Sequence, residues 1–194
     1  MLKRLGHRWL QSFSRRYQYD TAYMEKLLDH SPATFLKFST LHLLSSHRRR
    51  IPVTPWNAAR IRAVLREDCG PCAQLVCNMA LEAGVEAATL TAIVALDLNA
   101  LDSDTALVVR FTELVMSRDP AADELRAQIH QRWGDAGLIS LALTISTTKV
   151  YPSMKYVLGH GHICSRVQLH EQSVTPIRFA DATTGATLCA AGAL

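Results

Sequence analysis

Apolar residues recur every three or four positions along most of this chain, and no segment alternates strictly between apolar and polar residues. This spacing places apolar side chains on one face of a helix, whereas a half-buried strand requires alternation. The sequence therefore predicts an all-α fold. With 194 residues, 48% of them hydrophobic, the chain can bury one sizeable core.

Proline, glycine and changes in composition divide the chain into three predicted parts. Residues 1–50 form an N-terminal helical lead-in, residues 51–169 a helical core, and residues 170–194 an irregular C-terminal tail. In the lead-in, Ser31 followed by Pro32 predicts an N-cap with proline in the first turn. The apolar stripes predict core helices over residues 57–65, 71–83, 89–101, 104–116, 120–133, 137–148 and 152–158.

The ends of several core helices are marked by typical capping residues. Gly84, Gly134 and Gly159 are the expected helix stops, and Ser103 is the expected cap of the helix over 104–116. The stretch 137–148 is very apolar but too short to cross a bilayer. It predicts a central buried helix or a contact between subunits.

The charge pattern argues against nucleic acid and membrane partners. The formal charge is only +4, and much of the excess lies before the first acid, Asp20. A nucleic-acid surface usually shows dense Lys and Arg across a domain, so we expect no nucleic acid partner. No apolar run near the start reaches the roughly 20 residues of a spanning helix, so we expect no stable membrane insertion. The start predicts an amphipathic helix packed on the body or on a neighbouring subunit, with an Arg-rich transit peptide as the alternative.

Cysteine usage indicates a reducing compartment. The chain has five cysteines, an odd number, and no secretory signal is expected. Such a set fits reactive or buried thiols better than a disulfide framework, so a cytoplasmic location is predicted.

The segment Cys69-Gly70-Pro71-Cys72 carries the chemistry that the sequence predicts. Proline is tolerated at the start of a helix, so both cysteines are expected in an opening turn. There the unpaired amides and the positive end of the helix dipole favour thiolate over thiol. Two thiols at this spacing can close into a disulfide, which suits reversible two-electron chemistry.

Two acids directly precede this pair and are included among the candidate catalytic residues. Glu67 and Asp68 oppose thiolate formation electrostatically, yet a neighbouring carboxylate can also accept or relay a proton. Either cysteine can attack. Cys69 is expected nearer the exposed turn, and so is the more natural contact for an external disulfide, with Cys72 lying deeper.

Two other interpretations of the cysteine pair remain. A zinc site could combine Cys69 and Cys72 with two of His160, His162 and Cys164, but the late cluster lacks the usual paired spacing. The thiols could also be inert structural residues. We expect no metal and no resident cofactor; Cys77 is expected in the core, and Cys189 has no expected role.

Residues 69–84, which open on the cysteine pair and end in glycine, resemble the core motif of the alkylhydroperoxidase D / carboxymuconolactone decarboxylase superfamily. The resemblance extends over about residues 56–101, with a lead-in around 19–38. It implies a helical bundle that assembles as a trimer or hexamer. It also implies that Cys69 and Cys72 reduce hydroperoxides or exchange disulfides with a thiol/disulfide reductant protein.

The chain departs from the family pattern at both proton-relay positions. The family histidine falls four residues after the second cysteine, where this chain has Val76, and the family glutamate falls twelve before the first, at Asn57. Without these groups no general base is positioned for peroxide turnover. Disulfide exchange requires fewer catalytic groups, because a lowered thiol pKa provides most of the activation. His42, His160 or His162 could substitute from elsewhere in the fold. The sequence thus predicts a thiol-disulfide redox protein, with a non-catalytic helical oligomer or partner-binding protein as the alternative.

Overall fold

The computed structural model describes residues 2–160, 167–169 and 172–177 of the chain. These residues are mostly helical and include one short antiparallel hairpin. The helical prediction is therefore confirmed for the greater part of the described chain, and the hairpin is a departure from it.

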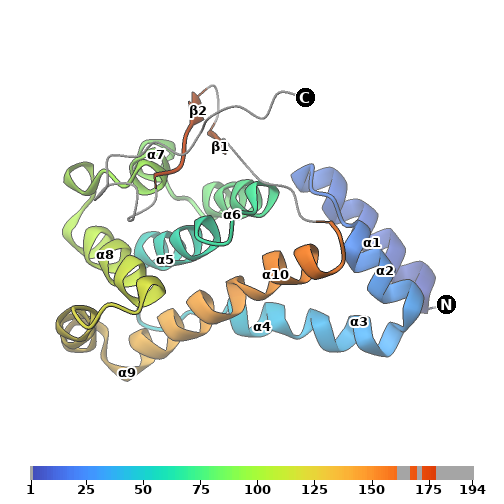
Figure 1. The fold of residues 1–194 in the computed structure, drawn as a ribbon, viewed down its shortest axis with the longest axis horizontal. Helices are drawn as coiled ribbons and strands as arrows, with labels where there is room; N and C mark the ends of the chain where they lie inside the picture. The colour runs from blue at the N-terminus through green and yellow to red at the C-terminus, as the bar shows by residue number, and fades with distance from the viewer. Residues whose placement is uncertain (1, 161–166, 170–171, 178–194) are drawn as a thin grey trace.

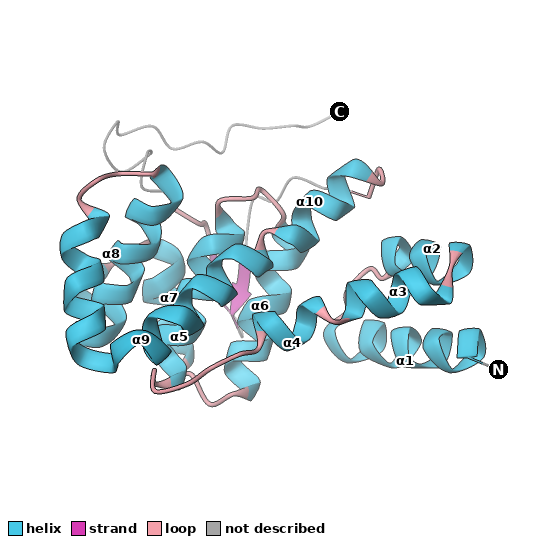
Figure 2. Cartoon of the chain, turned by 90° about the horizontal axis from the view of Figure 1, so that it is seen from below, coloured by secondary structure: helices cyan, strands magenta, loops and turns pink. Residues whose placement is uncertain are grey.

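The helices follow one another with short connections. Their bounds are α1 (Leu2–Tyr17), α2 (Ala22–His30), α3 (Pro32–Ser39), α4 (Leu41–Ser45), α5 (Val53–Leu65), α6 (Gly70–Glu82), α7 (Ala87–Ala95), the 3-10 helix η1 (Leu98–Ala100), α8 (Ser103–Ser117), α9 (Ala122–Thr148) and α10 (Val150–Val157). Figures 1 and 2 show α1, α2 and α3 grouped at one end of the molecule and α5, α7 and α8 at the other, with α4 leading between them.

The N-terminal helices pack on the body, as the favoured interpretation predicts. Leu10 of α1 is fully buried in the main core, and α1 lies so close to α2 that a Cβ on Gly6 would fall 2.7 Å from a methyl group of Leu28. Ser31 caps α3 as expected, because its hydroxyl accepts a hydrogen bond from the Thr34 amide at 3.3 Å. The apolar stripe that follows Ser31 is interrupted at Thr40, which separates α3 from α4.

Several predicted helix ends shift by a few residues. Asp102, not Ser103, caps α8, because its carboxylate accepts from the amides of Asp104 and Thr105 at 3.0 Å each. α7 ends at Ala95, six residues early, since Leu96 adopts a left-handed conformation with φ 56°. Gly84 follows α6 with φ 88°, the left-handed stop that was expected.

Gly134 marks a kink and not a helix end. Its φ of 64° and ψ of −169° interrupt α9, and the chain then resumes as a helix to Thr148. Of the apolar residues after it, Leu141 and Ile145 are buried, whereas Ile139 is exposed. The predicted buried helix over 137–148 is therefore buried on one face only.

The hairpin joins β1 (Val167–Leu169) to β2 (Gln172–Val174), with Val167 opposite Val174. Val167 and Leu169 are buried, and Gln168 between them is exposed. Gln74 of α6 holds the hairpin by two hydrogen bonds to the backbone of Gln168, at 2.6 and 2.7 Å. The tail predicted to be irregular from residue 170 thus includes a strand at 172–174, and residues 178–194 lie outside the described part of the chain.

A buried ion-pair network ties α5 to its neighbours. Arg62 is fully buried, and its Nε lies 2.5 Å from Glu113 Oε1 of α8. Its other nitrogens donate to the carbonyls of Ile93 and Val94 at 3.1 Å and of Ile177 at 2.7 Å. Burial lowers the pKa of Arg62, and the attraction of Glu113 opposes that shift. Arg66 forms a second ion pair with Glu113 at 3.1 Å.

None of the described helices is both long enough and apolar enough to cross a membrane.

Glu113→Gln should lower the free energy of unfolding by about 3–5 kcal/mol, because it leaves the buried Arg62 without a counter-ion. The matched control is Asp123→Asn, which removes an exposed ion pair with Arg126 and should cost less than about 1 kcal/mol. Denaturant unfolding of both variants measures the difference. Equal losses in the two variants would show that the buried network does not stabilise the fold.

Candidate functional site

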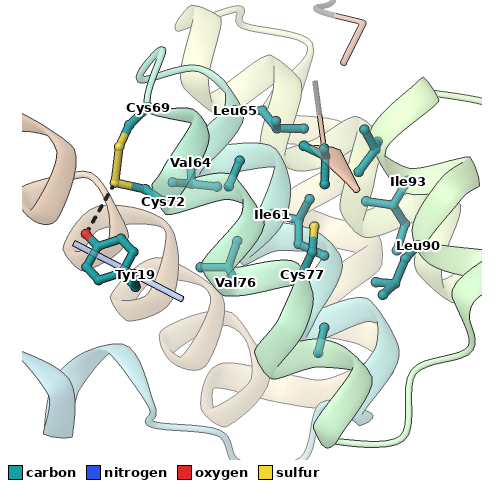
Figure 3. Packing of buried hydrophobic residues seen from close by; sticks show 14 of the residues in the cluster. Tyr19, Ile61, Val64, Leu65, Cys69, Cys72, Val76, Cys77, Leu90 and Ile93 are labelled. Carbon is teal, nitrogen blue, oxygen red and sulfur yellow. Dashed lines mark hydrogen bonds between the residues drawn. A yellow bond between two sulfur atoms is a disulfide. The ribbon is translucent and has the colours of Figure 1, made fainter. Parts of the chain in front are cut away.

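The two cysteines lie where α6 begins. Cys69 is the N-cap of α6 and Cys72 is in its first turn, with Pro71 between them. Their sulfur atoms form a disulfide, with the Cα atoms 5.2 Å apart (Figure 3). The prediction that the pair occupies the opening turn of a helix at bonding distance is confirmed. The first-turn amides of α6 would stabilise a thiolate formed there by reduction.

Both sulfur-bearing residues are buried, in contrast to the expectation that Cys69 is the outer one. Cys69 is 2% exposed and Cys72 is 4% exposed. Of the two, Cys72 lines a cavity of about 490 Å³. The cavity therefore gives Cys72, and not Cys69, an opening toward a small molecule.

The cavity lies where the N-terminal helices meet α5, α6 and the junction of α9 with α10. Its walls are mainly apolar, and the aromatic residues among them are Trp9, Phe13, Tyr17, Tyr19, Tyr23, Phe35, Phe38 and Tyr151. The polar side chains on its walls come from Ser12, Arg16, Ser39, His42, Arg60 and Thr148. A concave, mainly apolar site with a few polar groups is the usual form of a small-molecule pocket, and this volume is in the usual range.

Tyr19 makes a polar contact with the disulfide. Its hydroxyl lies 3.7 Å from Cys72 Sγ, as the dashed line in Figure 3 marks. Burial raises the pKa of Tyr19 to about 12, so the phenol keeps its proton at neutral pH. A protonated phenol can donate a hydrogen bond to a thiolate on Cys72, which stabilises the charged form.

Lys155 of α10 lies behind Tyr19, on the face of its ring. The Lys155 ammonium is fully buried and stands 4.7 Å from the Tyr19 ring centroid and 5.7 Å from that of Tyr23. Burial lowers the pKa of Lys155, and Asp20 opposes that shift. A cation on the face of the ring draws electron density from the phenol and so strengthens its hydroxyl as a donor toward Cys72.

The two predicted acids lie next to the pair in sequence and have other contacts. Glu67 forms an ion pair with Lys149 at 3.7 Å. Asp68 has a φ of 52°, and its carbonyl accepts a hydrogen bond from the Tyr156 hydroxyl at 3.1 Å. These contacts lie in the turn that leads into α6. A role of either carboxylate in proton transfer stays a prediction.

The relay positions carry no proton-transferring group. Val76 lines the cavity, and the Asn57 amide donates to the Val53 carbonyl within its own helix at 2.9 Å. His42, from α4, lines the same cavity as Cys72. Burial and the nearby Arg60 lower the pKa of His42, so its imidazole is neutral and able to accept a proton at neutral pH.

The remaining cysteines divide into one described residue and two that are not described. Cys77 is fully buried, as predicted, and burial raises its pKa to about 12. Cys164 and Cys189 lie outside the described residues, as does His162. Within the ranges that the structure describes, no three His, Cys, Asp or Glu side chains are grouped to hold a metal ion.

Sequence reasoning missed Tyr19, Lys155 and Arg60 as members of this site. Tyr19 is 53 residues from Cys72, and its apolar spacing marks it only as part of a helical stripe. Lys155 lies on α10, in a segment that carries no motif. No local pattern signals either contact, because both depend on how the N-terminal helices pack against α6 and α10.

Tyr19→Phe should slow the alkylation of reduced Cys72 at neutral pH by roughly fivefold, because a hydrogen bond to the thiolate worth about 1 kcal/mol is lost. Tyr23→Phe is the matched control: the hydroxyl of Tyr23 contacts that of Tyr19 at 3.5 Å and no sulfur. Rates of iodoacetamide labelling, followed by peptide mass spectrometry, test this. An unchanged rate in Tyr19→Phe would remove Tyr19 from the site.

Comparisons with protein families, with curated proteins and with solved structures give no match to this chain. The disulfide at the start of α6 and the cavity beside Cys72 are therefore the features on which a function can be argued.

Proposed function

We propose that this protein is a thiol-disulfide oxidoreductase in which Cys72 is the attacking thiol and Cys69 the resolving thiol. One observation carries the proposal: the disulfide closes across the opening turn of α6, with Cys72 on the wall of a cavity. The resemblance of residues 69–84 to the alkylhydroperoxidase D motif supports the same chemistry. The expected setting is the reducing cytoplasm.

Disulfide exchange by this pair proceeds in two steps. In the reduced protein, the Cys72 thiolate attacks one sulfur of a substrate disulfide, the substrate S–S bond breaks, and one half leaves as a thiolate that takes up a proton. The Cys69 thiolate then attacks Cys72 in this mixed disulfide and releases the second half as a thiol. The substrate gains two electrons, the Cys69–Cys72 disulfide forms, and an external dithiol protein returns the pair to its reduced state.

Disulfide exchange is favoured over peroxide reduction. Attack on a hydroperoxide transfers one oxygen to Cys72 as a sulfenic acid and releases an alcohol, and Cys69 then displaces water to close the disulfide. The departing alkoxide needs a proton donor. Val76 and Asn57 cannot donate in this way, and no hydrogen bond joins His42 to either cysteine among the described residues. The Tyr19 phenol near Cys72 is a weak acid, because burial raises its pKa to about 12.

Mapping of thiols by peptide mass spectrometry tests the redox role. In the folded, reduced protein, Cys69 and Cys72 should lose their reactivity to alkylation when an oxidised dithiol is added and regain it on reduction. Cys77 should stay unmodified near pH 8 throughout, because burial keeps its pKa at about 12 and its thiol protonated. Failure of Cys69 and Cys72 to lose reactivity together would contradict the proposal.

A matched pair of variants assigns the two roles. Cys69→Ser should trap a mixed disulfide with a small aromatic disulfide at Cys72, because no resolving thiol is left to release it. Cys72→Ser should trap little, because Cys69 does not line the cavity. Preferential trapping in Cys72→Ser would reverse the assignment.

A second proposal, self-association, rests on exposed leucines of α3 and α4. Leu36, Leu43 and Leu44 are 64%, 70% and 46% exposed on two consecutive short helices. Adjacent apolar side chains left in solvent are typical of contact surfaces between proteins. We propose that a second copy of the chain covers them, in line with the trimer or hexamer that the resemblance implies.

Leu43→Glu should shift the protein toward the monomer, because burial of a carboxylate in an apolar contact is unfavourable. Val157→Glu is the matched control, since Val157 is 83% exposed on α10, outside this surface. Sedimentation velocity compares the variants with the unmodified chain. A monomeric unmodified chain, or an equal shift in both variants, would exclude α3 and α4 as the contact.

A further inference from the structure

Arg60 is a partly buried cation on the cavity wall that lacks a counter-ion among the described residues. Among the described residues no carboxylate pairs with it, and its Nε is buried without a hydrogen-bond acceptor. Its Nη2 contacts Met79 Sδ at 3.3 Å, which is a weak acceptor, and its guanidinium lies 5.8 Å from the Trp56 ring centroid. Arginine keeps its charge under physiological conditions, so this site holds an unneutralised positive charge.

The neighbouring groups do not supply the missing negative charge. Burial raises the pKa of Tyr151, and it also raises that of Tyr17, so neither phenol is ionised at neutral pH. Glu82 is already engaged, because its two carboxylate oxygens bind Arg16 at 3.0 Å and Tyr17 at 2.6 Å. A partly buried charge that lacks a partner is incompletely solvated, so an anion that enters the cavity would be stabilised at Arg60.

Thr148 provides a second, independent sign of a ligand. Its side chain is 3% exposed, its Oγ1 lacks a hydrogen-bond partner within the described chain, and it lines the same cavity from the end of α9. A threonine hydroxyl can donate to a ligand oxygen. Two unsatisfied polar groups and mainly apolar walls together describe a site for a molecule with one acidic end and one apolar end.

We propose that this cavity binds an amphipathic monocarboxylate, whose carboxylate pairs with Arg60 and whose hydrocarbon part lies against the aromatic walls. One anionic charge is expected because, of the two arginines that line the cavity, Arg16 is neutralised by Glu82 and Arg60 has no ion pair within the described part of the chain. A planar carboxylate matches the two-pronged donor geometry of a guanidinium. The Thr148 hydroxyl hydrogen-bonds a second polar atom of the ligand. This binding role goes beyond the redox role proposed above and uses no thiol.

Binding of octanoate and of 1-octanol tests the proposal and is followed through the tryptophan fluorescence of the protein, to which Trp9 on the cavity wall contributes. The unmodified protein should bind octanoate roughly tenfold or more tightly than 1-octanol, because the charge-assisted hydrogen bonds to Arg60 are available only to the acid. This comparison requires no variant and so does not depend on how a variant folds. Equal affinities, or no binding of octanoate, would overturn the proposal.

Variants then locate the acid-binding group. Arg60→Met should abolish the preference for octanoate while 1-octanol still binds, Arg60→Lys should retain part of the preference, and Thr148→Val should weaken octanoate binding by about threefold. Arg110→Met, which removes an exposed arginine of α8, is the matched control and should leave the preference unchanged. A preference that persists in Arg60→Met would overturn the proposal. Because binding and thiol chemistry are measured separately, failure of one proposal leaves the other standing.

Discussion

The buried pair between Arg62 and Glu113 ties α5 to α8, and α6, α7 and α9 also pack against α5. Arg62 binds a carboxylate of α8, two carbonyls near the end of α7 and one carbonyl beyond the hairpin. Each nitrogen of this guanidinium donates at least one hydrogen bond, which makes its burial tolerable. Arg60 lies two residues earlier on the same helix, roughly 200° away around the axis, and no carboxylate of the described residues forms an ion pair with it. On one face of α5, Arg62 is therefore paired within the protein. On the other face, Arg60 places a positive charge on the cavity wall.

The site at Cys72 depends on segments that are distant in sequence. The start of α6 provides the disulfide and the first-turn amides, the connection between α1 and α2 provides the phenol of Tyr19, and α10 provides the ammonium behind that phenol. The N-terminal helices thus contribute walls and a hydrogen-bonding group, and they are not merely a lead-in to the core. A small change in how they pack would alter both the access to Cys72 and the polarity around its sulfur.

The parts of the structure that local chemistry controls were predictable from the sequence. Ser31, Pro71 and Gly84 each favour one backbone conformation at one place, so the ends of α3 and α6 and the location of the cysteine pair follow from them. Gly134 bends α9 without ending it, because apolar residues on both sides let the helix resume. Strands of three residues are too short to show an alternation, which is why the hairpin was missed. Arg60 and Arg62 look alike in sequence, and only long-range packing makes one an internal anchor and the other a candidate anion site.

The hydrogen bond from Arg62 to the Ile177 carbonyl has a consequence for how far the chain can be shortened. Ile177 also donates its amide to Val94, so the stretch after β2 is joined to the centre of the molecule at two points. A truncation after the last long helix would remove one hydrogen-bond acceptor from the Arg62 guanidinium, which solvent does not reach. The minimal autonomous unit therefore extends through residue 177, although the helices alone suggest that it could stop near residue 160.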